Sequence, residues 1–314
     1  MTTITFPTAS PIHRTTDGGS ANESQPTPPS PKTATFVGGC AVLVWATAAS
    51  FAVLGTTLPP MLFIGGAFAS GFLAFLVARL LRGQPVLGML AVPLPVLCLL
   101  VVGFLGHNGL YVTALRYAPA AQVNLISYLW PLLMVGLLAA TQVAEPTPGQ
   151  LAGSVLGFIG LVWFVSPGSV NGSFFGYALA FSAACCFAAY SALRAKVSGG
   201  PADAAGAACG VAAIASLFIH FAFGGSTSIE VDLMAILAMV LIGIGPMGVA
   251  NLFWDYGVRY GDGRVLSTLA YLTPVLSTLL LVGLGLATLT SQVLVGGAFI
   301  LGGIFLSAAS GRKA

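Results

Sequence analysis

The sequence predicts an all-α integral membrane protein with ten transmembrane helices, arranged as two inverted repeats of five helices each. Composition indicates the class, because 57% of the 314 residues are apolar and only 6% are charged. An ordinary soluble domain carries roughly 25% charged residues, and so few charges could not cover its surface. The apolar segments indicate the number of helices, and a repeat along the chain indicates the inverted arrangement.

The N-terminal segment, residues 1–34, differs from the rest of the chain. It is rich in Ser, Thr and Pro and contains no apolar run, so it cannot bury enough surface to offset its chain entropy. We expect a disordered tail. The segment does not resemble a signal peptide, since it is long and polar and no basic region adjoins the first apolar run. That first run is therefore expected to remain as a membrane helix.

Ten apolar segments are long enough to cross a bilayer, which takes roughly 20 residues per helix. A first five-helix repeat is expected at 35–166, a second at 173–309, and a short tail at 310–314. The predicted segments lie near 36–54, 60–81, 94–116, 121–141, 149–166, 174–194, 203–223, 233–256, 265–286 and 290–309.

The distribution of basic residues predicts the orientation. If the N-terminus is cytoplasmic, ten of the 11 Lys and Arg residues fall on the cytoplasmic side, and only Arg116 falls outside. Cytoplasmic loops carry an excess of Lys and Arg. Both termini are therefore predicted to be cytoplasmic, in a plasma membrane of the bacterial inner-membrane type.

The internal repeat relates positions that are 143 residues apart. Asn108 aligns with Asn251, and the run Tyr128-Leu129-x-Pro131 aligns with Tyr271-Leu272-x-Pro274. Five helices per repeat is an odd number, so the second repeat enters the membrane from the opposite side. Inverted repeats are typical of alternating-access transporters, with the substrate site near the midplane between the repeats. Channels and some membrane enzymes also contain duplications. Of these three interpretations, transport is the favoured one.

Several local motifs carry a resemblance to a known family. They are Trp45-Ala46 in the first segment, the run from Asn108 to Tyr117, the run from Tyr128 to Pro131, and Glu145. Together they resemble the EamA family of the drug/metabolite transporter superfamily, and within it the aromatic amino-acid exporter branch, over residues 36–309. The resemblance implies export of amino acids, aromatic ones above all. Glu145 aligns with Thr288, so any role of this carboxylate is confined to one repeat.

Polar residues in the third segment are candidates for binding a substrate. His107, Asn108 and Tyr111 share one helical face, and Asn251 repeats Asn108 in the second half. Polar groups at bilayer depth usually face a cavity or another helix. Each asparagine therefore either binds a substrate ammonium or carboxylate or makes an interhelical hydrogen bond. His107 either binds substrate or a proton, or is a satisfied neutral residue.

Aromatic residues could form the wall of the same cavity and would suit an apolar side chain of the substrate. The alternative is the interfacial belt that Trp and Tyr form at membrane surfaces. Pro131 and Pro274 each remove one helical hydrogen bond, so they are candidate hinges or plain structural kinks. The aromatic candidates are Trp45, Tyr128, Trp130, Phe187, Tyr190, Trp254 and Tyr271.

Other chemistry has little support in the sequence. Sequence motifs of metallo-hydrolases, serine hydrolases and nucleotide-binding loops are missing, so we expect no catalytic residues, no metal site and no cofactor. Asp255 is expected to pair with Arg259 one helical turn later. The expected partners are an amino-acid substrate and lipid, without nucleic acid, and a monomer is the working assumption. The predicted function is export of small amphipathic metabolites, with drugs or other metabolites, or an embedded enzyme, as alternatives.

Overall fold

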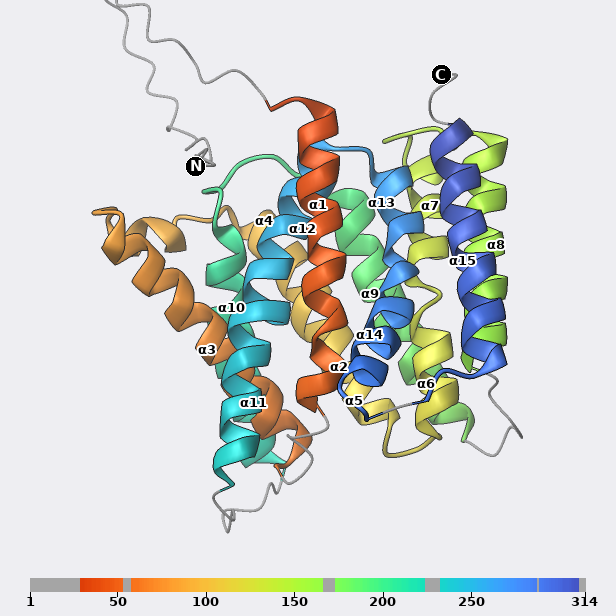
Figure 1. Cartoon of the computed structure of the whole chain (residues 1–314). Coiled ribbons are helices and arrows are strands. Elements are labelled where there is room, and N and C mark those ends of the chain that lie inside the picture. Colours follow the sequence, from red (N-terminus) through yellow and green to blue (C-terminus); the bar gives the residue numbers. More distant parts are fainter. Residues whose placement is uncertain (1–28, 53–57, 166–172, 224–231, 287, 311–314) are drawn as a thin grey trace, which may run out of the picture.

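A computed structural model describes residues 29–52, 58–165, 173–223, 232–286 and 288–310, and within these ranges every regular element is a helix. Figure 1 shows them as one bundle. The elements of the first half are α1 Pro31–Ala46, α2 Ala48–Ala52, α3 Pro60–Leu81, η2 Val86–Leu90, α4 Leu94–Val101, η3 Val102–Gly106, α5 His107–Ala114, α6 Ala120–Ser127, α7 Trp130–Ala140 and α8 Pro148–Val165. Those of the second half are α9 Phe174–Leu193, α10 Ala204–Ala222, α11 Leu233–Ile244, η4 Gly245–Val249, α12 Ala250–Tyr260, α13 Gly263–Ala270, α14 Leu272–Gly283 and α15 Ser291–Ser310.

Nine helical spans in the described part of the chain are long and apolar enough to cross a membrane. Each coincides with one of the predicted segments to within a few residues. They are Pro60–Leu81, Leu94–Ala114, Ala120–Ala140, Pro148–Val165, Phe174–Leu193, Ala204–Ala222, Leu233–Tyr260, Gly263–Gly283 and Ser291–Ser310. The chain is therefore an all-helical membrane protein.

The first predicted segment is divided, since a turn at Thr47 separates α1 from the short α2. Helix α1 also begins at Pro31, so residues 31–34 are helical and the prediction of disorder was wrong for them. The reason is local, because the Ser30 hydroxyl accepts a hydrogen bond from the Thr33 N–H and proline occupies the first helical turn. The rest of the predicted tail, residues 1–28, lies outside the described residues.

Two of these spans, Leu94–Ala114 and Leu233–Tyr260, each contain one π-helical segment at mid-length. Segment η3 joins α4 to α5, and η4 joins α11 to α12. The bounds Val102–Gly106 and Gly245–Val249 differ by the same 143 positions that relate the two halves of the sequence. A π-bulge is a rare irregularity that occurs frequently at functional sites. Its presence at both equivalent positions shows that the irregularity belongs to the repeated unit.

Two other spans, Ala120–Ala140 and Gly263–Gly283, are both interrupted just before a proline. The helix breaks at Tyr128 and Leu129 between α6 and α7, and at Tyr271 between α13 and α14. Pro131 and Pro274 have no N–H to donate to the carbonyl four residues earlier. The helical path is thus broken at equivalent places in the two halves.

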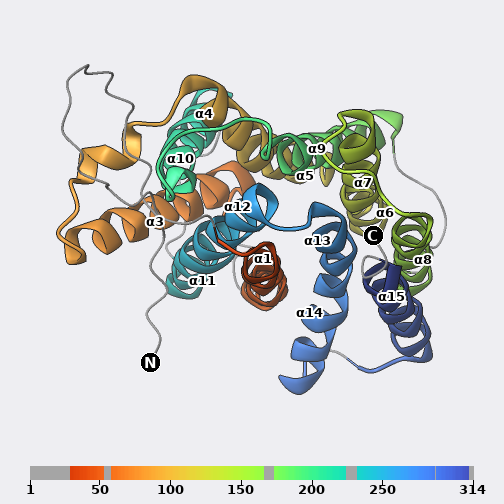
Figure 2. The ribbon, with the colours of Figure 1, turned by 90° about the horizontal axis from the view of Figure 1, so that it is seen from above.

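The two halves interlock rather than standing side by side. Helix α1 packs against α12, and α9 packs against α5, so the first helix of each half contacts the third span of the other. In the same way α3 contacts α11, and α10 contacts α4 (Figure 2). Helices α3 and α10 also pack against each other, and the Arg79 guanidinium at the end of α3 donates two hydrogen bonds to the Asp203 carboxylate beside α10, at 2.6 and 2.9 Å.

Helices α8 and α15 form an antiparallel pair through glycines at equivalent positions. A Cβ atom added at Gly153 would lie 2.4 Å from the Gly303 carbonyl oxygen, and one added at Gly160 would lie 2.7 Å from that of Gly296. Small residues permit such close approach of helix backbones. Gly153 and Gly160 of α8 therefore form a helix-packing surface within the molecule.

Candidate substrate-binding site

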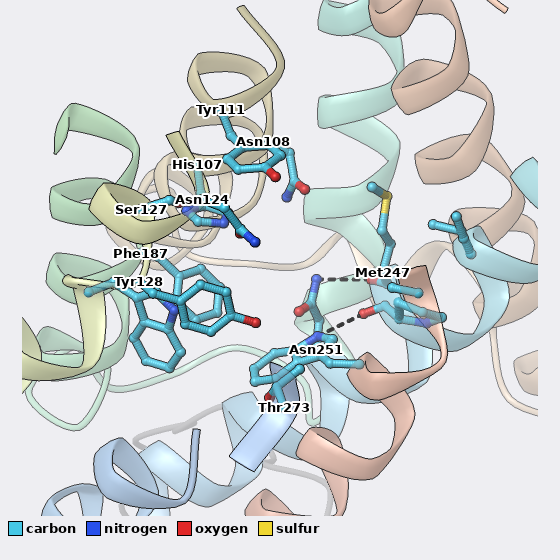
Figure 3. Close-up of a pocket in the computed structure, with 15 residues that line it drawn as sticks. His107, Asn108, Tyr111, Asn124, Ser127, Tyr128, Phe187, Met247, Asn251 and Thr273 are labelled. Carbon is cyan, nitrogen blue, oxygen red and sulfur yellow. Dashed lines mark hydrogen bonds between the residues drawn. The ribbon is translucent and has the colours of Figure 1, made fainter. Parts of the chain in front are cut away.

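A cavity of about 280 Å³ lies in the middle of the bundle, between helices of both halves (Figure 3). Helices α5, α6 and α7 face α1, α2 and the span that runs from α11 through η4 to α12, and α9 and α14 complete the wall. The lining residues are Trp45, Ala48, His107, Asn108, Tyr111, Asn124, Ser127, Tyr128, Trp130, Phe187, Ile242, Pro246, Met247, Asn251 and Thr273.

The π-bulges position two asparagines at this cavity. The Asn108 amide donates to the Phe104 carbonyl at 2.8 Å, and the Asn251 amide donates to the Met247 carbonyl at 3.1 Å. Each bond spans four residues from the bulge into the following helix, and the two bonds are equivalent under the repeat. The interhelical hydrogen bond that we considered from the sequence is therefore replaced by a bond within the same span.

The second bulge also receives a donor from the first helix. Pro246 has no N–H, and its carbonyl accepts from the Trp45 indole Nε1 at 3.1 Å. This contact joins residues that are 201 positions apart. It places the Trp45 ring in the wall of the cavity and fixes α1 against η4.

His107 lies beside the cavity with one ring nitrogen bound to the backbone. Its Nδ1 lies 3.0 Å from the Ala183 carbonyl oxygen. Because a carbonyl oxygen can only accept, Nδ1 carries a hydrogen and donates it. The ring stacks on Tyr111, with centroids 6.3 Å apart, and contacts Phe187 at 5.2 Å.

Four aromatic rings form one cluster at an end of the cavity, and we call it the aromatic floor: Trp45, Trp130, Phe187 and Trp254. Every pair among these rings is in contact, with centroid separations from 4.7 to 6.5 Å. Most pairs meet edge to face, which is a favoured geometry for aromatic rings. The floor therefore offers a rigid apolar surface to any bound molecule.

Three predicted wall residues lie behind the lining instead of in it. Trp254 is fully buried under the other three rings and donates from Nε1 to the Ser191 hydroxyl at 2.9 Å. Tyr190 is fully buried between Phe104 and Phe187. Tyr271 is fully buried at the helix break between α13 and α14, where it packs on Phe158. Their helical faces point toward neighbouring helices, so they support the wall without reaching the cavity.

A buried ion cluster lies beyond the aromatic floor. The Arg194 Nε donates to the Asp255 carboxylate at 2.7 Å, and both side chains are at most 1% exposed. The Tyr190 hydroxyl donates to the same carboxylate oxygen at 3.3 Å. Arg259, the partner expected from the sequence, lies farther away at 3.8 Å. The expected pair is present, but Arg194 is the closer and more buried partner.

The ion cluster lies near one end of the helices that carry it. Arg194 lies at the end of α9, and Asp255 and Arg259 lie in the second half of α12. That end of α12 is beside the start of α1, since the Gly38 and Gly257 backbones meet there. The ion cluster is therefore on the side at which α1 begins and α15 ends (Figure 1).

Sequence reasoning missed several lining residues. Met247 could have been found from the repeat, because it is the counterpart of Phe104. No pattern singled out Ala48, Ile242, Pro246 or Thr273, whose small or apolar side chains line the cavity because the bulge and the helix break lie there. Glu145 lies outside the lining, and its backbone carbonyl accepts from Arg264 at 2.8 Å.

The lining carries no Asp, Glu, Lys or Arg side chain among the described residues. Within the same residues there is also no group of three or more His, Cys, Asp or Glu side chains that could hold a metal ion. The cavity thus combines aromatic surface with neutral hydrogen-bonding groups. Such a lining fits a small molecule that has one apolar part and one polar part.

Comparison with known proteins agrees with this geometry. The model of the EamA-like transporter family matches the chain twice, over residues 33–166 and again over 174–309. The chain is 33% identical over 287 residues to the aromatic amino acid exporter YddG of Ancylobacter novellus, which covers 89% of this chain and 98% of that protein. A solved structure titled only as the crystal structure of a protein superposes with a TM-score of 0.84 at 33% identity, covering 90% of this chain and 100% of the other. With a family match over both halves and a central cavity between them, the chain belongs to the EamA-like transporter family and is a membrane transporter.

Proposed function

We propose that this transporter exports aromatic and other apolar amino acids across a bacterial inner membrane, by alternating access between two inverted five-helix repeats. The observation that carries the proposal is the pairing, in one cavity, of an aromatic floor with neutral amide and hydroxyl groups. The relative named as an aromatic amino acid exporter is similar over nearly its whole length, which supports the same substrate class. Transport of this kind needs no catalytic residue and no cofactor.

The lining supports this substrate class through its two kinds of surface. An aromatic or branched apolar side chain would lie against Trp45, Trp130 and Phe187. The amino and carboxylate groups would lie among the amides of Asn108, Asn124 and Asn251 and the nearby hydroxyl groups. A volume near 280 Å³ is close to the lower end of the range of small-molecule pockets, about 300–1,000 Å³, which suits a ligand of amino-acid size.

Three symmetric features support the inverted-repeat part of the proposal. The π-segments, the helix breaks and the asparagine bonds all recur at the offset of 143 residues. The glycine contacts of α8 and α15 exchange partners as an approximate two-fold axis requires. On this proposal α1 and α2 together form the tenth span, with repeats at 35–166 and 173–309.

Orientation and motion follow from the same proposal. The excess of Lys and Arg places the start of α1 and the end of α15 in the cytoplasm. On this proposal the aromatic floor and the ion cluster close the cavity on the cytoplasmic side, and the cavity faces outward. Export requires this closure to open inward, and the helix breaks before Pro131 and Pro274 are the proposed hinges, one in each repeat.

The test is uptake of labelled phenylalanine, tryptophan, threonine and methionine into proteoliposomes, with and without a pH gradient. We expect saturable uptake in which these substrates compete. Uptake that needs no gradient would support facilitated export, and uptake only with a gradient would make His107 and Asp255 candidates for proton coupling. If folded protein transports none of them, the substrate class reverts to drugs or other metabolites.

Matched variants test the location of the site. Trp130→Ala and Tyr128→Ala are expected to abolish transport, because they remove part of the floor and of the polar wall. Trp163→Ala removes the same kind of side chain from α8, where Trp163 is 54% exposed, and it is expected to transport like the unmodified protein. Normal transport by both Trp130→Ala and Tyr128→Ala would show that substrate passes elsewhere.

A further inference from the structure

The atoms of the cavity that remain free to bind a ligand have a definite chemical character. An asparagine amide contains one NH₂ group, which donates, and one oxygen, which accepts. A backbone carbonyl only accepts, so the Asn108 and Asn251 atoms bonded to the Phe104 and Met247 carbonyls must be the nitrogens. The bulges therefore engage one of the two N–H donors of each amide and leave Oδ1 of each as an available acceptor.

The oxygens of these amides face the cavity. Figure 3 shows the Asn251 nitrogen directed to the Met247 carbonyl and its oxygen turned to the open space, with Asn108 at the same space. Each half contributes one of these asparagines, and the repeat relates the two. A ligand between them meets two acceptors.

His107 supplies a third acceptor to the same region. Its Nδ1 hydrogen is donated to the Ala183 carbonyl, so in the neutral ring Nε2 carries a lone pair. His107 lines the cavity next to Asn108. Each of the three residues thus offers one available acceptor on this part of the wall.

The complementary ligand group is a donor with a positive charge. Three acceptors match the three N–H bonds of a primary ammonium, and the aromatic faces nearby attract a cation through their π-electrons. No Lys or Arg among the described residues lines the cavity, so a substrate carboxylate would meet only neutral donors. Hydrogen bonds to an ionised group are stronger than neutral ones. The ammonium of an amino acid therefore meets three acceptors and the aromatic floor in this part of the cavity.

We propose that Asn108 and Asn251, one from each repeat, recognise the substrate ammonium through Oδ1, so that primary aromatic amines form a second class of substrate. This inference rests on the proposed function for the location of the site and extends its substrate range. An aromatic amine keeps the ring and the ammonium and lacks only the carboxylate. An aromatic acid without the amino group leaves the acceptors unpaired, and a site built around hydrogen bonds rejects such analogues strongly.

The first experiment is competition in proteoliposomes of the unmodified protein. Labelled phenylalanine uptake is measured against 2-phenylethylamine, tryptamine, 3-phenylpropionate and N-acetylphenylalanine. We expect the amines to inhibit at concentrations within about tenfold of that of unlabelled phenylalanine. The two acids, which lack a free amino group, are expected to need a concentration at least a hundredfold higher than that of phenylalanine. If the acids inhibit as well as phenylalanine and the amines do not, the proposal is overturned.

A binding assay that does not depend on transport tests ammonium recognition separately from amino-acid export. Quenching of tryptophan fluorescence in detergent reports ligands at the aromatic floor, which contains three of the four tryptophans. Binding of 2-phenylethylamine without binding or transport of phenylalanine would refute amino-acid export and leave ammonium recognition standing. Transport of phenylalanine with no binding of either amine would overturn ammonium recognition and leave amino-acid export standing.

A pair of substitutions separates ligand recognition from a structural role. Asn251→Asp keeps an acceptor oxygen but cannot donate to the Met247 carbonyl, and Asn251→Leu loses both functions. If the amide serves only the bulge, both variants lose binding equally. We expect Asn251→Asp to bind 2-phenylethylamine at least tenfold more tightly than Asn251→Leu, and the same order for the Asn108 variants. Equal affinity of the Asp and Leu variants at both positions would overturn the assignment.

Discussion

Removal of the Asp255 carboxylate should destabilise the protein strongly. In Asp255→Ala the Arg194 guanidinium stays charged, because arginine does not deprotonate in proteins, and it remains 0% exposed. Loss of one partner from a buried ion pair costs about 3–5 kcal/mol. The Tyr190 hydroxyl also loses its acceptor, but that loss belongs to the same network and is not added separately.

Thermal unfolding in detergent, followed by tryptophan fluorescence, measures this effect. At about 2–4 °C per kcal/mol, the expected decrease in Tm is on the order of 6–20 °C. Glu145→Ala is the matched control, since it removes an exposed carboxylate and should change stability by less than about 0.5 kcal/mol. The double variant Asp255→Leu with Arg194→Met removes both fully buried charges, leaves only the more exposed Arg259 without its partner, and should regain much of the loss.

Two results would refute this reasoning. If Asp255→Ala unfolds at the same temperature as Glu145→Ala, the ion cluster contributes nothing measurable. If the double variant is no more stable than Asp255→Ala, the loss does not come from an uncompensated charge on Arg194.

Two further changes test contacts that hold the halves together. Gly153→Ala should lower Tm, because the added Cβ would lie 2.4 Å from the Gly303 carbonyl oxygen, whereas Gly136→Ala on α7 meets nothing within 4 Å and should leave Tm unchanged or slightly raised. A decrease of equal size in both variants would contradict the close approach of α8 and α15. Arg79→Lys should cost about 1–3 kcal/mol, because lysine cannot reproduce the two parallel bonds to Asp203. Unchanged unfolding of Arg79→Lys would mean that only the charge matters there.

The sequence was sufficient to predict the membrane class and most of the spans, because apolar length and scarcity of charge follow directly from the solvent around each helix. The asparagines and the Tyr-Leu-x-Pro runs were also identifiable, since polar residues repeated in an apolar chain are conspicuous. The π-bulges were not, because one extra residue in a helical turn leaves no mark in an almost uniformly apolar segment. They could be located only from the backbone.

The finer arrangement of the site depends on packing that local patterns do not encode. Trp130 and Trp254 look alike in the sequence, yet Trp130 lines the cavity and Trp254 lies behind it. The difference arises because the other three rings of the aromatic floor cover Trp254. Arg194 was counted among the basic residues on the cytoplasmic side, at the end of the predicted segment 174–194, and in the structure its side chain is fully buried on Asp255. Charge counting gives the side of the membrane and says nothing about such pairing across 61 positions.

The interlocking of the two halves has a consequence for synthesis. The Trp45 indole binds a carbonyl that is 201 positions later in the chain, and α1 rests mainly on α12. At about 5–20 residues per second, the ribosome supplies that partner about 10–40 s after α1 has left it. During this time α1 must wait in the lipid without its native neighbour. Two separately expressed halves should accordingly be degraded when made alone and be stable when made together.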